Sequence, residues 1–346
     1  MKSFTSLVIS SFCLASLASA NPHAQGGHQH LHYAAPVLIT TADGSDIQVT
    51  SVALNGKMAG TSTYSSSQFN GYIWDSPTSV PSALPSGIYP QLINKKGSFV
   101  TVNLQFYASV SSSPVNLSYP QNYDIFPISM NDKDEIVGVF YNDFTGDYSG
   151  GYWNGQQAFS FLPPPAGSQG QFAAYINDKH HVFGIELPQG DYFSYGIEWS
   201  DPTQAGSYIS GPVMSDPGYW QIVGGNMQTG DSVAVYRYQN TRLGCGFRDS
   251  NSNTIEVIPF VDGAIPTAVS NNGIIIGQQQ TSSGVIPLVW ASKYATPVDL
   301  NTLIPTGTGW TLTRASFILS NGDIVGQGTY MDGATVKSGF FYLQRQ

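Results

Sequence analysis

Hydrophobic residues in this chain occur in short runs, separated by clusters of Gly, Asn, Asp and Lys. Runs such as Ile274–Ile276 consist of β-branched residues. Both features are typical of β-strands joined by tight turns. No long stretch has the 3.6-residue period of an amphipathic helix, so the pattern predicts an all-β protein.

One nine-residue pattern of apolar run, turn and second apolar run appears seven times. Five copies are clear: VALNGKMAG (52–60), MNDKDEIVG (130–138), INDKHHVFG (176–184), VSNNGIIIG (269–277) and ILSNGDIVG (318–326). Two are weaker: INKKGSFVT (93–101) and NMQTGDSVA (226–234). The fifth residues of successive copies lie 37 to 50 residues apart. This period, of roughly 40–50 residues, is typical of a four-stranded propeller blade.

Each repeat is predicted to contain four strands. The nine-residue pattern supplies two strands and the tight turn between them, where Gly or Asn adopts a positive φ easily. A variable loop follows, and a third strand ends in an aromatic residue in most copies. Four of these aromatic residues are Trp74, Trp153, Trp199 and Trp290. A fourth strand, such as residues 296–300, completes the unit.

The seventh repeat ends after three predicted strands, at residues 339–343. Residues 35–40 form an orphan strand before the first turn, and their pairing with the last repeat would close a ring and remove an exposed edge. We therefore predict that residues 35–346 form one seven-bladed β-propeller closed by an N-terminal strand. The alternative is an open β-repeat solenoid, which would need polar caps that the sequence does not show.

The first 20 residues have the features of a signal peptide. Lys2 precedes an apolar stretch from Phe4 to Leu17, and residues 18–20 (ASA) have the small-x-small form of a cleavage site. The stretch is shorter than the roughly 20 residues of a membrane span, so no span is expected after cleavage. Residues 21–34 are expected to be a histidine-rich flexible tail. We expect an exported protein, extracellular or periplasmic.

The mature chain would retain a single cysteine, Cys245. One cysteine forms no internal disulfide, so stability must come from an ordinary hydrophobic core.

Several repeat units carry a resemblance to a known family. These are ISMNDKDEIVG with GGYW, AAYINDKHHVFG with YGIEW, TAVSNNGIIIGQ with PLVW, and DLNTLIPTGTGWTLTRASFILSNGDIVGQGTY. They resemble the HAF repeats of exported bacterial proteins over most of residues 49–343, most weakly in repeats two and five. The aromatic residue that usually precedes the third-strand Trp is replaced here by Tyr72-Ile73, Tyr152 or Ile197-Glu198. The resemblance implies export and a β-repeat architecture, and it implies no defined reaction.

The charge and the motifs exclude several functions. The formal net charge is −9, with 13 Lys and Arg against 22 Asp and Glu, which argues against a nucleic-acid partner. The sequence contains no nucleophile elbow, no metalloprotease helix motif, no phosphate-binding loop and no Cys-x-x-Cys. No catalytic residue is therefore assigned.

The histidines fall into two groups, neither of which predicts a firm metal site. His180 and His181 occupy a turn that holds Gly-Asp or Asp-Glu in other repeats, so we interpret them as turn residues. His23, His28, His30 and His32 in the tail form a weak candidate site for Zn²⁺ or Cu²⁺, with a plain flexible spacer as the alternative. No cofactor is expected, with Ca²⁺ or Zn²⁺ as a weak candidate.

The loops between the second and third strands of repeats three and four are the candidate ligand site. Residues 141–150 (YNDFTGDYSG) and 188–196 (PQGDYFSYG) mix carboxylates with aromatic rings, which suit a sugar or a peptide. Such loops of adjacent blades emerge on one face, opposite the first turns. The candidate residues are Asp143, Phe144, Asp147, Tyr148, Asp191, Tyr192, Phe193 and Tyr195.

The sequence thus predicts an exported, monomeric, non-catalytic propeller that binds a glycan, a peptide or an envelope partner. Two alternatives stay open. One is a secreted glycan-active hydrolase or lyase, for which the acidic residues of repeats three and four would supply paired carboxylates. The other is a purely structural envelope protein.

Overall fold

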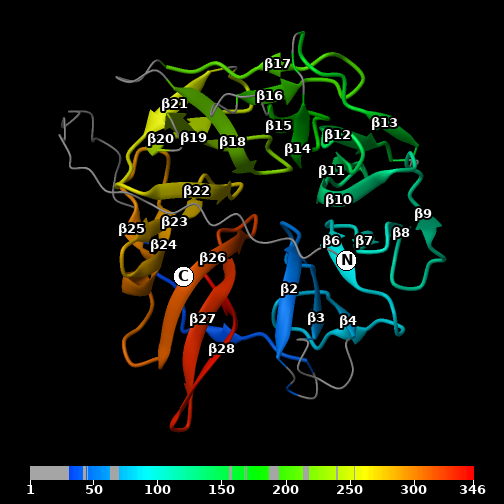
Figure 1. Cartoon of the computed structure of the whole chain (residues 1–346). Helices are drawn as coiled ribbons and strands as arrows, with labels where there is room; N and C mark the ends of the chain where they lie inside the picture. Colours follow the sequence, from blue (N-terminus) through cyan, green and yellow to red (C-terminus); the bar gives the residue numbers. More distant parts are fainter. Residues whose placement is uncertain are drawn as a thin grey trace.

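The computed structural model describes residues 31–346 except 42, 43, 45, 63–69, 156, 157, 167, 169, 187–194, 213–217, 239, 240 and 253. Within this part of the chain the strands form seven four-stranded antiparallel sheets. The sheets are arranged as blades around a common centre (Figure 1). The 3₁₀ helix at Leu300–Leu303 is the only helix among the described residues. The predicted all-β, seven-bladed propeller is confirmed.

Blades 1 to 4 are each built from four consecutive strands. Blade 1 contains β2 (Ile47–Val52), β3 (Met58–Ser62), β4 (Gly71–Trp74) and β5 (Ser82–Ala83). Blade 2 contains β6 (Pro90–Ile93), β7 (Phe99–Thr101), β8 (Gln105–Tyr107) and β9 (Val115–Asn116). Blade 3 contains β10 (Tyr123–Met130), β11 (Ile136–Asn142), β12 (Tyr148–Trp153) and β13 (Phe159–Phe161). Blade 4 contains β14 (Gln171–Ile176), β15 (Val182–Glu186), β16 (Gly196–Trp199) and β17 (Ser207–Tyr208).

Blades 5 and 6 follow the same plan, and blade 7 takes its outer strand from the other end of the chain. Blade 5 contains β18 (Tyr219–Gly225), β19 (Ser232–Tyr238), β20 (Thr241–Arg248) and β21 (Ile255–Ile258). Blade 6 contains β22 (Ala264–Val269), β23 (Ile275–Thr281), β24 (Gly284–Trp290) and β25 (Val298–Asp299). Blade 7 contains β26 (Trp310–Ile318), β27 (Ile324–Asp332), β28 (Thr335–Leu343) and β1 (Val37–Leu38).

The first strand of each blade is its innermost strand. Each of β2, β6, β10, β14, β18 and β22 contacts the first strand of the next blade (Figure 1). All seven innermost strands carry a β-bulge. A bulge bends its strand and increases the local twist, which suits strands that line the centre of a ring.

The first turn of every blade has the predicted backbone. The fifth residue of each copy of the nine-residue pattern has a φ between 66° and 93°: Gly56, Gly97, Asp134, His180, Gly230, Gly273 and Gly322. Glycine is favoured there because a Cβ is strained in this region. The turn of blade 5 is one residue longer than the others, because Asn226 N bonds to Asp231 O whereas Asn177 N bonds to His181 O.

Hydrophobic contacts between neighbouring blades form the core. The third-strand residues Trp74, Trp153, Trp199 and Trp290 are fully buried. The indole of Trp153 donates to Ser118 O at 2.7 Å, and that of Trp199 donates to Pro163 O at 2.6 Å. Both carbonyls belong to the segment that enters the same blade, so each tryptophan holds its blade to the chain from the preceding one.

The N-terminal strand closes the ring. β1 pairs with β28 in blade 7, with Val37 opposite Tyr342 and Leu38 opposite Phe341. The predicted closure is confirmed, and the open solenoid is wrong.

Two residues before the predicted domain start at residue 35, Leu31 and Tyr33, are buried in the core cluster shared by blades 6 and 7. Tyr33 also pairs with Arg345 in an isolated bridge.

Candidate functional site

The loop between β11 and β12 is held in shape by hydrogen bonds to Asn142. Asn142 Oδ1 accepts hydrogen bonds from the backbone N–H of Phe144 and of Thr145, at 2.9 and 3.3 Å. Gly146 has a φ of 76° and donates to Asn142 O. This turn leads the chain back into blade 3 through Asp147, directly before β12, which begins at Tyr148.

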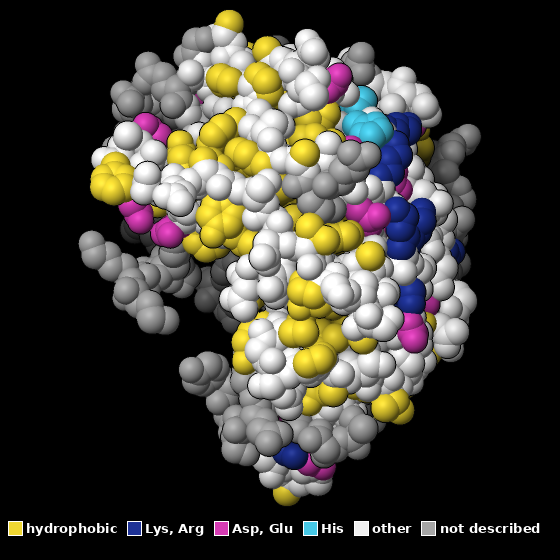
Figure 2. Space-filling model, turned by 90° about the vertical axis from the view of Figure 1, so that its right-hand side faces the viewer, with side chains coloured by type: hydrophobic (Ala, Val, Ile, Leu, Met, Phe, Trp, Pro, Cys, Tyr) yellow, Lys and Arg dark blue, Asp and Glu magenta, His cyan; other side chains and the backbone are white. Residues whose placement is uncertain are grey.

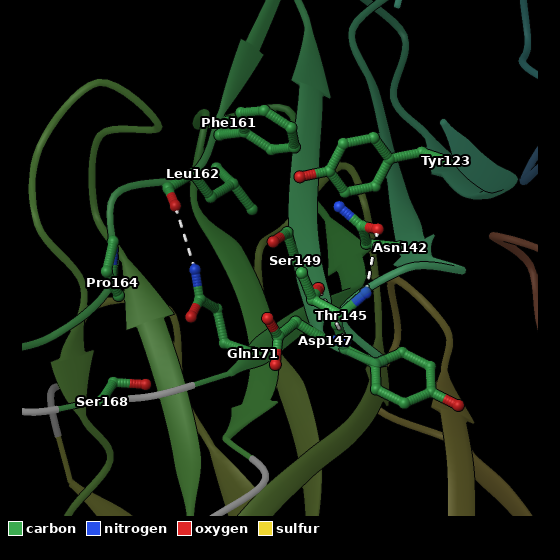
Figure 3. A pocket seen from close by; sticks show the side chains of 11 residues that line it. Tyr123, Asn142, Thr145, Asp147, Ser149, Phe161, Leu162, Pro164, Ser168 and Gln171 are labelled. Carbon is green, nitrogen blue, oxygen red and sulfur yellow. Dashed lines mark hydrogen bonds between the residues drawn. The ribbon is translucent and has the colours of Figure 1, made fainter. Parts of the chain in front are cut away.

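A pocket of about 360 Å³ lies beside this loop, at the junction of blades 3 and 4. Its walls come from all four strands of blade 3, from the segment after β13 and from the start of β14 (Figure 3). The lining residues are Tyr123, Asn142, Thr145, Asp147, Tyr148, Ser149, Phe161, Leu162, Pro164, Ser168 and Gln171. The pocket is therefore built between two blades.

The pocket combines aromatic rings with hydrogen-bonding groups. Tyr123 and Phe161 form one side of it, with ring centroids 5.5 Å apart. Gln171 Nε2 donates to Leu162 O at 3.1 Å, which holds the amide in place. Ser168 Oγ is buried and has no hydrogen-bond partner. A polar ligand group could satisfy this hydroxyl, because a buried polar atom without a partner costs free energy.

The charge in the pocket is negative. Asp147 is the only acidic residue among the described residues that line the pocket, and no Lys or Arg belongs to the lining. The Asp147 side chain is exposed. The pocket therefore disfavours anionic ligands and offers one carboxylate to hydroxyl or ammonium groups.

The structure separates the predicted site residues. Asp147 and Tyr148 line the pocket, whereas Asp143 and Phe144 lie at the loop tip and do not; the Phe144 side chain is 81% exposed. Tyr195 lies in blade 4, beside Tyr208 and Tyr219. The remaining candidates, Asp191, Tyr192 and Phe193, lie outside the described residues.

Sequence reasoning missed most of the pocket walls. Tyr123, Phe161, Ser168 and Gln171 lie outside the loops between second and third strands. Phe161 had a signal in the sequence, because the fourth strand of blade 3 reads FSF where those of blades 1, 2 and 6 read SA, VN and VD. Ser168 had no signal, because only the three-dimensional structure brings the segment after β13 against β12.

His180 and His181 lie in the first turn of blade 4, as predicted, and they bond to neighbouring carboxylates. His180 Nδ1 lies 2.7 Å from Glu135 Oε1 in blade 3, and its Nε2 lies 2.8 Å from Lys133 Nζ. His181 Nδ1 lies 2.9 Å from Glu198 Oε1 in its own blade. The turn is therefore part of an interblade polar network.

Glu198 is held by both His181 and Arg248. Arg248 Nη2 lies 2.9 and 2.8 Å from its two oxygens. Burial acts to raise the pKa of Glu198, but the hydrogen bonds and positive charges of His181 and Arg248 outweigh it, and the pKa lies below its usual value. Figure 2 shows basic, acidic and histidine side chains gathered in a band along one edge of the molecule.

Among the described residues, no group of three or more His, Cys, Asp or Glu side chains is placed to hold a metal ion. His32 is exposed, and the other tail histidines, His23, His28 and His30, lie outside the described part. Within the same part, no helix is long and apolar enough to cross a membrane.

Comparison with known proteins finds similarity in structure and none in sequence. No family model matches the chain, and no curated protein sequence matches it. An oligogalacturonate lyase in complex with manganese is similar with a TM-score of 0.57 and 11% identity, over 91% of this chain and 96% of that one. A prolyl endopeptidase structure is similar with a TM-score of 0.56 and 11% identity, over 89% of this chain and 50% of that one.

A third similar structure is the β-propeller domain of the Trilobed protease from Pyrococcus furiosus, which has an open velcro topology. Its TM-score is 0.52 at 9% identity, over 85% of this chain and 98% of that domain. These likenesses show that the chain is a propeller protein. At such identities they show the fold alone.

Proposed function

We infer that this propeller is a non-catalytic binding protein whose pocket between blades 3 and 4 holds a glycan. The observation that carries this is the composition of the pocket wall, in which aromatic rings stand beside amide, hydroxyl and carboxylate groups. Sugars present apolar C–H faces that stack on rings and hydroxyl edges that bond to such groups. The volume of about 360 Å³ suits one or two sugar units.

The charge of the site narrows the glycan class. Asp147 on the wall and the net charge of −9 favour neutral sugars or amino sugars over uronic acids. An ammonium group of an amino sugar would gain a charged partner in Asp147, whereas a uronate carboxylate would be repelled.

The number of carboxylates favours binding over hydrolysis. Glycoside hydrolysis commonly uses two carboxylates about 5–9 Å apart. The described pocket lining supplies only Asp147. Asp143, the nearest other carboxylate of the loop, lies at its tip outside the lining.

Retention on immobilised polysaccharides tests the proposal. The protein is passed over β-1,4-glucan, chitosan and polygalacturonate, and bound protein and newly formed reducing ends are both measured. We expect retention on the neutral or the amino-sugar polymer, none on polygalacturonate, and no product. Release of product would favour the hydrolase or lyase alternative. Failure to bind any of the three would overturn the proposal in favour of a peptide or envelope partner.

Tyr148→Ala is the matched site variant, and Tyr294→Ala is its control. Tyr148 lines the pocket, whereas Tyr294 is 68% exposed in the turn after β24. We expect Tyr148→Ala to lose about tenfold in affinity, since one stacked ring contributes on the order of 1 kcal/mol. Tyr294→Ala should bind as the unchanged protein does.

We also propose that the protein is an exported monomer of the HAF-repeat family. Support comes from the signal-like residues 1–20 and from the nine-residue pattern of the repeats. The mass of the secreted chain tests the export, because cleavage after Ala20 would leave Asn21 as the first residue.

A further inference from the structure

A cluster of three tyrosines lies next to the pocket, at the junction of blades 4 and 5. The ring of Tyr195 lies 5.7 Å from that of Tyr208 and 5.8 Å from that of Tyr219. Tyr195 and Tyr208 are 44% and 46% exposed, whereas Tyr219 is buried. The ring of Tyr195 thus lies between the exposed ring of Tyr208 and the buried ring of Tyr219.

The blade does not need an exposed ring at the position of Tyr208. The pairing of strands makes this position equivalent to Phe161 in blade 3, since each lies opposite the same point of the third strand. The residues at this position in blades 1, 2, 5 and 6 are Ala83, Asn116, Val257 and Asp299. Among these six blades, the ring therefore occurs only at the pocket and at the tyrosine cluster.

The cluster continues directly from the pocket wall. Gln171, which lines the pocket, is the ladder partner of Glu186 on the neighbouring strand. Glu186 N donates to Tyr195 O at 2.8 Å, so Tyr195 lies directly before β16, the next strand of the same sheet. The pocket wall and the cluster are therefore separated by two spacings between neighbouring strands, each of roughly 5 Å. This spacing matches the length of one sugar unit in an extended chain.

Glu186 places a negative charge beside the cluster, as Asp147 does in the pocket. Its side chain is buried and lies near Tyr208, whose pKa is raised first by burial and then by the interaction with this carboxyl. The carboxylate beside the tyrosines and Asp147 in the pocket both disfavour an anionic chain.

We propose that the tyrosine cluster Tyr195, Tyr208 and Tyr219 is a second subsite, and that the ligand is an extended neutral or amino-sugar oligosaccharide that spans blades 3 to 5. This inference rests on the proposed function, because it places further sugar units beyond those in the pocket. A ligand that fills both subsites is bound more tightly than one that fills only the pocket, because the second contact is intramolecular.

Two series of probes test the proposal by chain length. Cello-oligosaccharides and β-1,4-linked glucosamine oligomers of two and six units are titrated by calorimetry into the unchanged protein, Tyr208→Ala, Tyr195→Ala and Tyr294→Ala. In at least one series we expect the hexamer to bind at least tenfold more tightly than the dimer. Tyr208→Ala and Tyr195→Ala should each weaken the hexamer about five- to tenfold and leave the dimer unchanged. Tyr294→Ala should change neither.

The outcomes separate the second subsite from the pocket. If the dimer and the hexamer bind equally well, or if Tyr208→Ala weakens both probes alike or neither, the second subsite is wrong while the pocket stands. If neither series binds at any length, the proposed glycan function fails and the subsite fails with it. Melting temperatures of all variants within a few degrees of the parent show that folding is not the cause.

Discussion

In the first turns, different residues adopt the same positive-φ backbone conformation. Five of the seven positive-φ positions are glycine, and the other two are Asp134 and His180. A side chain at these two positions bears backbone strain of roughly 1–2 kcal/mol. His180 in turn bonds to the buried Glu135 of the neighbouring blade, and such a charged hydrogen bond offsets strain of this size. The turn histidines therefore join blades 3 and 4.

Replacement of both histidines tests whether they are structural. His180→Gly with His181→Asp copies Gly322-Asp323 of the last repeat. We expect glycan retention to be unchanged, because the turn lies on the face opposite the pocket. The melting temperature should fall, because Asp at position 181 places a second carboxylate against Glu198. Lost retention at an unchanged melting temperature would show that the histidines belong to a binding site.

The ion pair of Glu198 predicts a pH dependence of stability. Its pKa is lower in the folded state than in the unfolded chain. Such a carboxylate stabilises the fold above its unfolded pKa of about 4.3, and this contribution is lost as the pH falls through the folded value. In urea unfolding, Glu198→Gln should therefore be clearly less stable than the parent at pH 6, and the difference should shrink by pH 3. Asp143→Asn, at an exposed loop tip, should show no such difference at either pH.

The approach of the innermost strand explains why the nine-residue pattern ends in glycine in five blades. In five blades this glycine lies opposite the bulge of the innermost strand, and an added Cβ would meet a carbonyl oxygen of that strand. The five are Gly60, Gly138, Gly184, Gly277 and Gly326, with distances of 2.1 to 2.7 Å. Real Cβ atoms do not approach this closely, so in these five blades the innermost strand can lie this near only because the residue is glycine. Blade 5, which has Ala234 here, carries Gly224 and Gly225 in its innermost strand.

Gly277→Ala tests this coupling. Its Cβ would lie 2.1 Å from Ile265 O, so the innermost strand of blade 6 must shift. We expect a loss of about 1–3 kcal/mol in the free energy of unfolding. Ser282→Ala, in the exposed loop of the same blade, is the control and should change it little. An equally small loss for Gly277→Ala would mean that the strand adapts without strain.

The whole molecule depends on joining its two ends. Blades 7 and 1 share a core cluster that includes Ile39, Trp74, Val325 and Phe340. The backbone of Ser320 in blade 7 also donates to Leu54 O in blade 1. β1 covers the outer edge of β28, and an exposed edge strand is prone to pair with other chains.

Removal of the closing strand should open this edge. A variant that lacks residues 1–38 loses β1 together with the buried Leu31 and Tyr33, which contribute several kcal/mol. We expect a much lower melting temperature and self-association in light scattering. A variant that lacks only residues 1–30 should match the full chain in both measurements. A monomeric, stable chain without residues 1–38 would show that the ring does not need this closure.

The architecture was predictable because it depends on patterns of residues that are close in the sequence. Strand periodicity, positive-φ turns and a repeat of 37 to 50 residues each depend on a few neighbouring residues, and together they specify blades, their number and their closure. The weak copy at 226–234 shows the limit, since the longer turn at Asn226 shifts its alignment by one residue.

The candidate site was predictable only in part, and for a physical reason. Asp147 and Tyr148 follow from the composition of one loop, but the other walls come from Tyr123, Phe161 and Gln171, on three different strands. The sequence determined that this chain forms a ring of seven blades, and it placed Asp147 and Tyr148 together in one loop. Only the tertiary structure decided which residues meet at the pocket, because blade-to-blade packing brings together segments whose spacing along the chain carries no signal.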